Sequence, residues 1–355
     1  MNIIKLIIAF FMAFFQIMSP IGVMLTGGEA ELFDNWSAAE KFAADNYVEL
    51  VKDPDRDFVV LNLADIQLKD TEQFAAEGEY TFELIEKMIK EQKPDLITLS
   101  GDNAWGLVSY VELINFIDSF DIPWAPVMGN HDGQNTFNEF WCAYLFTKAD
   151  NCLFRFGPKN MGYGNYIINV TENGKIIHTF FMMDTHDNAT FGGVEGYDHL
   201  WSKQIDWYKW AVRGIESLAG ELVESTVIMH IPAYEYSTAW ALYGDDTTQK
   251  IKPELAEVAQ GYNREGVFCS PANNGFFSVC QTLGSTKNML CGHDHVNNFQ
   301  AYYEGIRLNY ALKSGYGSYW NADLNGATLI TLNSLGDAEV EHKYYAPLHG
   351  IVPKN

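Results

Sequence analysis

The chain has 355 residues, of which 47% are hydrophobic and 14% aromatic, and it carries a net charge of −23. This length and apolar content allow one large buried core, so we expect one large domain rather than two. The acidic balance argues against binding of duplex nucleic acid or anionic membranes through a basic face. It does not exclude a small phosphorylated substrate, because bound divalent cations dominate the field around them. No sequence feature indicates an obligatory protein partner.

The N-terminus, residues 1–28, has the pattern of an export signal. Lys5 is followed by an apolar stretch over residues 6–15 and then by a small-residue segment ending at Gly28. A charged start and an apolar centre of this length are typical of a secretory signal peptide. The alternative is an uncleaved membrane anchor, since residues 6–25 are about long enough to span a bilayer and no clear cleavage site is visible. Both interpretations place the body, residues 29–355, outside the cytoplasm, and secretion is the first expectation.

The cysteine spacing fits an exported chain. Cys142 lies close to Cys152 in the sequence, and Cys269 lies close to Cys280. Because disulfides persist in oxidising compartments, we expect these two local pairs, although the sequence does not prove the connectivity. The fifth cysteine, Cys291, lies in an apolar run and is predicted to be a buried thiol.

From residue 29 onward, strand and helix patterns alternate along the chain. Residues 29–56 are mixed and charged, and we expect them to form a surface helix leading into the domain. Short apolar runs, which predict strands buried on both faces, lie at 57–64, 95–100, 123–128, 176–183, 225–229 and 288–291. Helical periodicity predicts helices at 71–92, 108–120 and 201–218, and a β-rich part follows over 301–345. This alternation predicts an α/β fold, a two-sheet β-sandwich flanked by helices.

Residues that bind metals or move protons follow five of the predicted strands. They are Asp65, Asp102, the pair Asn130 and His131, His230, and the pair His293 and His295. Because sites in open α/β sheets form outside the carboxyl ends of the strands, we expect these side chains to lie close together.

These residues belong to short motifs with a recognisable order. The motifs are Asp65-Ile-Gln67, Gly101-Asp-Asn103, Gly129-Asn-His-Asp132, a lone His230 after a strand, and Gly292-His-Asp-His295. In order and spacing they resemble the calcineurin-like metallophosphoesterase superfamily, which includes purple acid phosphatases and many secreted phosphodiesterases. The resemblance covers roughly residues 57–300, and five motifs in order are far more specific than any one of them.

The resemblance implies two metal ions bridged by Asp102, with manganese, zinc, iron or magnesium as candidates. The first ion would take Asp65, Gln67, Asp102 and His295, and the second would take Asp102, Asn130, His230 and His293. His131 would hydrogen-bond the phosphate or protonate the leaving oxygen. Asp132 and Asp294 would orient histidines from behind the ligands. Two ions about 3.5–4 Å apart hold a hydroxide nucleophile for in-line attack on phosphorus.

Two positions depart from the family pattern. The family usually has a histidine where this chain has Gln67, and we expect the amide oxygen to weaken zinc or iron there and to favour harder ions such as manganese or magnesium. Trp105 stands where purple acid phosphatases carry an iron-ligating tyrosine, so a purple tyrosinate-to-iron protein is not expected.

The substrate is less determined by the sequence. Trp105, Tyr234 and Tyr316 are candidates for a substrate pocket, against the alternative that most such aromatic residues belong to the core. No cluster of basic residues near the motifs indicates a polyphosphate substrate, so we place phosphomonoesterase ahead of a diesterase for a small nucleotide or lipid headgroup. Alternatives of another class are a catalytically weak protein that binds phosphorylated ligands and a protein that uses the fold structurally.

Overall fold

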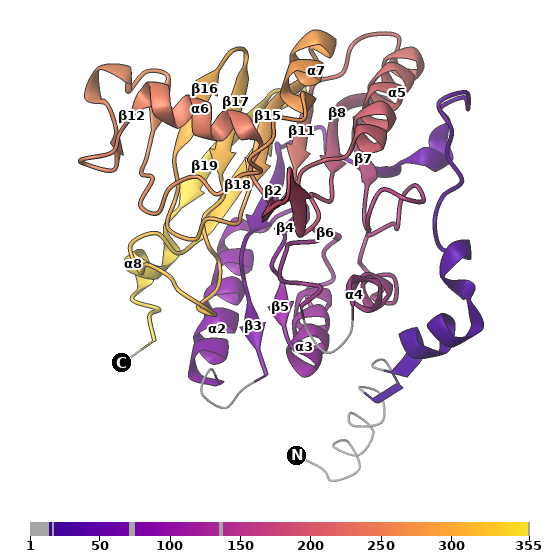
Figure 1. The fold of residues 1–355 in the computed structure, drawn as a ribbon, viewed down its shortest axis with the longest axis horizontal. Coiled ribbons are helices and arrows are strands. Elements are labelled where there is room, and N and C mark those ends of the chain that lie inside the picture. The colour runs from indigo at the N-terminus through magenta and orange to yellow at the C-terminus, as the bar shows by residue number, and fades with distance from the viewer. Residues whose placement is uncertain (1–13, 16–17, 71–74, 135–137, 354–355) are drawn as a thin grey trace.

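The computed structural model describes residues 14–15, 18–70, 75–134 and 138–353. Figure 1 shows two large sheets between two groups of helices, with α5, α6 and α7 on one outer side and α2, α3 and α4 on the other. This arrangement confirms the predicted α/β fold with two sheets flanked by helices. In the described part of the chain, no helix is both long enough and apolar enough to cross a membrane.

The five-stranded sheet has the order β19-β18-β2-β4-β6. Its strands are β2 (Phe58–Leu63), β4 (Leu96–Ser100), β6 (Trp124–Val127), β18 (Ala327–Leu332) and β19 (Ala338–Lys343). β2, β4 and β6 are parallel to one another, and β18 is antiparallel to β2. The helices on this side are α2 (Ala75–Gln92), α3 (Leu107–Asp118) and α4 (Glu139–Phe146). The parallel strands therefore end at one edge, and that edge carries the first three motifs.

The eight-stranded sheet has the order β1-β7-β8-β11-β15-β17-β16-β14. Its strands are β1 (Val48–Val51), β7 (Tyr166–Glu172), β8 (Lys175–Met182), β11 (Ser225–Ile228), β14 (Ala259–Gln260), β15 (Thr286–Cys291), β16 (Gln300–Tyr303) and β17 (Ile306–Tyr310). β8, β11, β15 and β17 run parallel. Its outer face is covered by α5 (Ser202–Ala219), α6 (Tyr234–Tyr243) and α7 (Phe276–Leu283). One buried cluster draws on both sheets, and a second lies between this sheet and its helices.

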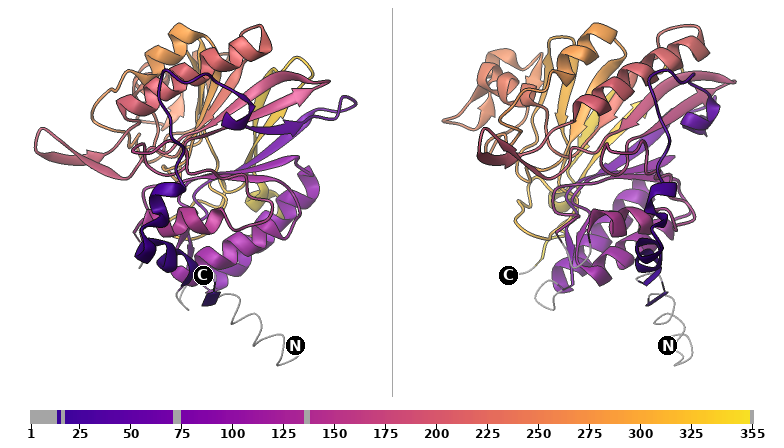
Figure 2. Two further views of the ribbon diagram at one scale, coloured as in Figure 1. Left: turned by 90° about the vertical axis from the view of Figure 1, so that its right-hand side faces the viewer. Right: turned by 45° about the vertical axis from the view of Figure 1, so that its right-hand side comes forward.

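Small elements complete the fold. Three two-stranded ribbons pair β3 (Leu68–Lys69) with β5 (Ala104–Trp105), β9 (Asn188–Phe191) with β10 (Val194–Tyr197), and β12 (Gly244–Asp245) with β13 (Lys250–Ile251). Other short helices include η1 (Gly28–Glu31), η2 (Ala44–Asn46), η4 (Pro253–Leu255) and α8 (Tyr345–His349), and residues 18–26 are helical as well. The left view of Figure 2 shows the β9–β10 hairpin projecting from the body of the molecule.

The prediction for residues 29–56 is wrong. This segment contains two 3₁₀ turns and the edge strand β1 instead of a surface helix. It has no helical apolar stripe, and β1 gains its hydrogen bonds by pairing in parallel with β7, far along the chain. The predicted signal segment falls largely on residues 1–13 and 16–17, outside the described residues, so that interpretation stays a prediction.

The two expected disulfides are absent, although all five cysteines lie in the described ranges. Cys142 lies on α4 and its Sγ contacts the carbonyl oxygen of Asp132 at 3.2 Å. Cys280 is buried on α7 beside the Tyr208 hydroxyl. One thiol of each expected pair thus faces a partner in the core, and the prediction from sequence spacing is corrected here. The expectation for Cys291 is confirmed, since it is buried.

Candidate metal centre

The predicted site residues come together where strands of both sheets end. Those of the five-stranded sheet are Asp65 after β2, Asp102 after β4, and Asn130 and His131 after β6. Those of the eight-stranded sheet are His230 after β11, and His293 and His295 after β15. Two sheets, rather than one sheet edge, therefore build the site.

The backbone around the ligands is held in an uncommon conformation. Asp65, Gln67, Asp102 and His293 have φ angles of 51°, 47°, 52° and 78°. Non-glycine residues rarely adopt this left-handed region, and where they do the surrounding structure must enforce it. Part of that enforcement is visible, because a β-carbon built on Gly129 would lie 2.2 Å from the Asp102 backbone nitrogen. The loops are thus packed to bring the carboxylates close together.

We call the first group of ligands the His295 half; it consists of Asp65, Gln67, Asp102 and His295. Ligand atoms of Asp65, Asp102 and His295 all lie within 4.8 Å of one another, and all three residues are buried. His295 Nδ1 lies 3.0 Å from the Tyr319 carbonyl oxygen, so Nδ1 carries the proton and Nε2 offers a lone pair, 3.6 Å from Asp65 Oδ1. The Tyr319 ring stacks on this imidazole at 4.1 Å. These three side chains are arranged as metal ligands are.

The second group, the His230 half, consists of Asp102, Asn130, His230 and His293. His230 Nε2 lies 3.0 Å from Asn130 Oδ1, 3.3 Å from Asp102 Oδ1 and 3.3 Å from His293 Nδ1. His230 Nδ1 faces the Ser100 carbonyl oxygen at 2.9 Å, which directs Nε2 into the site. His293 Nε2 is buried, and no described residue gives it a hydrogen-bond partner. Nitrogen and oxygen atoms that crowd together in this way fit a divalent cation.

Gln67 is not turned as a ligand would be. Its Nε2 donates to Asp102 Oδ2 at 2.8 Å, and its Oε1 accepts from Lys313 Nζ at 3.3 Å. The two neighbours fix this orientation, because the reverse one would put the amide oxygen against a carboxylate and the amide nitrogen against an ammonium. This differs from the predicted ligand role, and Lys313 is a residue that the sequence did not bring into the site.

The electrostatics of the cluster favour a cation. Burial raises the pKa of Asp65 to about 6, although His230 and Lys313 oppose this rise. Burial acts to lower the pKa of His230, but Asp102 and Asp65 outweigh it and raise that pKa to about 10. Burial lowers the pKa of His293 to about 3, and the neighbouring His230 adds to this. The two carboxylates thus favour a positive charge beside them, as the raised pKa of His230 indicates.

His131 is positioned by the loop after β4 and by its own loop after β6. Its backbone N–H donates to Asp102 Oδ1 at 2.9 Å, and its Nδ1 lies 2.6 Å from Gln134 Oε1. The Trp105 ring stacks on the imidazole at 4.4 Å, while Lys69 Nζ lies 4.7 Å from the Trp105 ring centre. The side chain of His131 is 30% exposed, so the ring can reach a ligand from solvent.

Asp132 and Asp294 hold loops in place. Asp132 accepts from the backbone N–H groups of Asn103 and Gly129, which joins two of the motifs. Asp294 accepts from the Tyr310 hydroxyl and from Phe268 N–H. The ring nitrogens of His230 and His295 are instead oriented by backbone carbonyl oxygens, so the expectation that these two aspartates orient histidine rings needs this correction.

The three candidate pocket residues have different environments. Tyr316 is fully buried and donates to the Ile351 carbonyl oxygen, so it is a core residue and the prediction for it is wrong. Tyr234 is 41% exposed and borders a shallow pocket that also contains His199. Trp105 borders the site as predicted. Its ring contacts His131 and Lys69. The sequence missed Tyr197, whose ring meets that of His293 edge-on at 4.4 Å.

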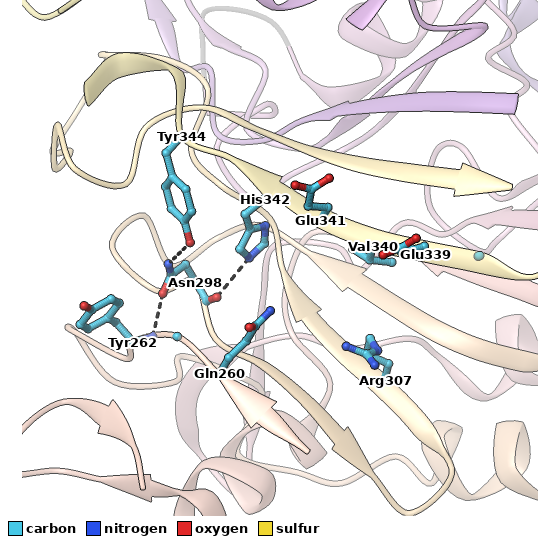
Figure 3. A pocket seen from close by; sticks show the side chains of 11 residues that line it. Gln260, Tyr262, Asn298, Arg307, Glu339, Val340, Glu341, His342 and Tyr344 are labelled. Carbon is cyan, nitrogen blue, oxygen red and sulfur yellow. Dashed lines mark hydrogen bonds between the residues drawn. The ribbon is translucent and has the colours of Figure 1, made fainter. Parts of the chain in front are cut away.

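A separate cavity of about 640 Å³ lies beside β14, β16, β17 and β19. Figure 3 shows that Asn298 is hydrogen-bonded to Tyr262, Tyr344 and His342 at one side of this cavity. Asn298 donates to the Tyr344 hydroxyl at 2.8 Å, accepts from Tyr262 N–H at 2.7 Å, and its carbonyl oxygen lies 3.1 Å from His342 Nε2. None of the residues of the predicted site lines this cavity, so we do not place the chemistry there.

Comparison with known proteins agrees with this geometry. The model of the calcineurin-like phosphoesterase family matches residues 58–297. The chain belongs to this family. A relative from Arabidopsis thaliana, "Probable inactive purple acid phosphatase 14", is 28% identical over 267 residues, 67% of this chain and 63% of the relative. "Phosphatase DCR2" from Saccharomyces cerevisiae is 26% identical over 231 residues, 61% of this chain and 38% of that protein.

The chain therefore spans less than two thirds of the length of these curated relatives. Among solved structures, a dimetal phosphatase from Danio rerio gives a TM-score of 0.49 at 11% identity, covering 79% of this chain and 94% of that one. Membership of the metallophosphoesterase family is shown, and it accounts for the ligand-like convergence of Asp65, Asp102 and His295.

Proposed function

We propose that this chain is a metal-dependent hydrolase of phosphate esters, with monoesters as the preferred substrates. The observation that carries the proposal is the convergence of Asp65, Asp102 and His295. Asp102 also faces His230 of the other half at 3.3 Å, as a shared ligand would. Family membership supports the reaction class, and one of the relatives is named a phosphatase.

The residues that would hold the ions are those of the two halves, with Gln67 the exception in its present orientation. When bound, a pair of divalent ions would supply positive charge that neutralises the phosphate and activates water. His131 is the group that can act on the substrate itself, by donating a hydrogen bond to a phosphoryl oxygen or a proton to the leaving oxygen. Gln134 and Trp105 keep its ring in place for this step.

The bases near the site support a small substrate rather than a polyphosphate. Lys313 is only 1% exposed and is bonded to the protein, so it is not available to a ligand. Lys69 lies against Trp105. With these two bases engaged by the protein, the bound ions would have to supply most of the phosphate affinity.

A second candidate is a protein that binds phosphorylated ligands with little or no turnover. The orientation of Gln67 favours it, because the His295 half then offers three ligand side chains instead of four. Some relatives are also named probable inactive phosphatases.

One assay separates these candidates. Metal-free protein is reconstituted with manganese, zinc, iron or magnesium and tested on an aryl phosphate and on a bis-aryl phosphate, with His131→Ala as the matched variant. Turnover that needs metal and falls in His131→Ala supports the hydrolase, and the ratio of the two rates distinguishes monoesterase from diesterase. If no metal gives turnover but phosphate still protects the metal-bound protein from unfolding, the protein binds phosphorylated ligands without hydrolysing them.

A further inference from the structure

The His295 half contains a buried lysine that none of the metal-binding motifs includes. Lys313 Nζ donates to the Asp65 carbonyl oxygen at 2.6 Å and to Gln67 Oε1 at 3.3 Å. The residue is 1% exposed, so its amine lies directly behind the first motif and out of reach of the substrate. Lys52 is the other lysine buried to this extent among the described residues, and it pairs with Glu172 elsewhere.

The backbone fixes Lys313 in this place. Lys313 forms a parallel bridge with Ala64, and Ser314 N–H donates to the Ala64 carbonyl oxygen at 2.8 Å. Two glycines then let the chain lie flush against the first motif, since a β-carbon on Gly315 would lie 2.1 Å from the Ile66 carbonyl oxygen and one on Gly317 would lie 1.8 Å from that of Gln67. The backbone of Lys313 therefore cannot move away without separating this segment from the loop.

Lys313 has two effects on the His295 half. Its bond to Gln67 Oε1 keeps the amide oxygen away from the cluster, which removes the ligand that would replace the usual histidine. The positive charge of Lys313 also lies behind the proposed site of a divalent cation, and the ammonium and the cation would repel each other. The His230 half, in contrast, keeps four ligand side chains. The group behind its His230 ring is a neutral backbone carbonyl oxygen instead of an ammonium.

We propose that Lys313 makes metal binding stepwise, so that one ion binds tightly in the His230 half and a second binds weakly in the His295 half. This rests on the proposed metal-dependent function. The difference in affinity should be about 10- to 100-fold, the size of effect that groups behind metal ligands usually have. Turnover that needs both ions should then continue to rise with free metal after the first equivalent has bound.

This inference differs from the expectation drawn from Gln67 alone. If the amide were simply a weaker ligand, Gln67→His would restore the second ion while Lys313 stays in place. If Lys313 is the cause, Lys313→Met should strengthen the second ion, because the amide of Gln67 is then free to turn its oxygen to the cluster. Gln67→His alone should change the second affinity little, since the ammonium remains behind it.

The test is calorimetric titration of metal-free protein with Mn²⁺, together with native mass spectrometry to count bound ions. The native chain, Lys313→Met, Gln67→His and the double variant are compared, and Lys52→Met controls for the loss of a buried ammonium elsewhere. We expect one tight ion in the native chain and in Lys52→Met, and a second ion about 10- to 100-fold tighter in Lys313→Met than in the native chain. If the methionine variant does not fold, Lys313→Gln serves because it removes the charge, and a smaller gain is expected there because its amide can still donate to Gln67 Oε1.

The native chain alone can overturn the inference, whatever the variants do. Two ions of similar affinity in the native protein would contradict it, and so would a second ion restored by Gln67→His but not by Lys313→Met. Failure of every form to bind any ion would overturn the metal-dependent function as well, so the two failures are distinguishable.

Discussion

The two halves of the metal centre use the same kinds of ligand but differ in the groups behind them. Backbone carbonyl oxygens orient His230 and His295 alike. Behind the His295 half, however, Lys313 holds the oxygen of Gln67 and adds a positive charge. The comparison teaches that the ligand motif alone does not fix how each ligand is oriented, because Lys313, from a distant segment, holds the amide oxygen of Gln67.

Replacing Asp102, which the two halves share, should have the largest effect on metal binding and turnover. Asp102 faces both halves, so Asp102→Asn should weaken both ions and lower turnover by at least about 10³-fold, since metal ions contribute several kcal/mol to such reactions. Rate assays and metal analysis of the same preparation check this. Asp118→Asn is the control, because Asp118 accepts from Trp124 Nε1 and Asn151 N–H outside the cluster. A variant that keeps one half fully loaded would show that Asp102 does not bridge.

His131 belongs to neither half, so its replacement should lower turnover without changing metal binding. His131→Ala should lower the rate by about 10²- to 10⁴-fold, the usual contribution of a proton-transferring side chain. Metal content and the affinity for each ion should stay as in the native chain, because the imidazole is not among the ligands. Equilibrium dialysis measures this second quantity. Loss of an ion in this variant would place His131 within one of the halves.

A histidine outside the centre gives a baseline for how burial acts on an imidazole. Burial lowers the pKa of His178 to about 4, while its bond to the Gly336 carbonyl oxygen and the charge of Asp337 oppose this. The unfolded chain, with an ordinary histidine pKa near 6.5, takes up a proton first as pH falls. The stability that depends on neutral His178 is therefore full above pH 6.5, and about 3 kcal/mol of it is lost as pH falls to 4.

Denaturant unfolding of metal-free protein at pH 7 and pH 4 measures this loss. In His178→Gln the decrease should be smaller than in the native chain. His342, whose pKa burial also lowers to about 4, continues to contribute in both. An equal decrease in the two proteins would contradict the prediction.

The smallest effect should come from the stack that positions His131. Trp105→Leu removes a ring contact at 4.4 Å, and such pairs contribute about 0.5–1.5 kcal/mol, so turnover should fall by about two- to tenfold with both ions retained. Trp201→Leu is the matched control, because Trp201 stacks on His186 at 3.8 Å elsewhere. A larger fall in Trp105→Leu would mean that the ring also contacts the substrate.

The strand-end residues were predictable because each follows a continuous apolar run. Asp65, Asp102 and His230 come directly after strands buried on both faces, and the structure places all three in the centre. Tyr316 was mispredicted because glycines and aromatic residues in sequence suggest a loop at a pocket, whereas here the glycines allow close packing against the first motif. The predicted pairing of Cys142 with Cys152 failed for a similar reason, since closeness in sequence says nothing about which core partner a thiol faces.

The sequence by itself determined the family, the α/β fold and the residue types at the carboxyl ends of the strands, because apolar periodicity and short motifs are local properties of the chain. An unequal pair of metal sites was already expected from Gln67, but only the tertiary structure decided that its amide oxygen faces Lys313 instead of the cluster. Lys313 lies 246 residues from Gln67 in the sequence, and the two meet because β-pairing brings the segment after β17 against the loop after β2. Which way an amide points depends on donors and acceptors from both segments, and that information exists only once the chain has folded.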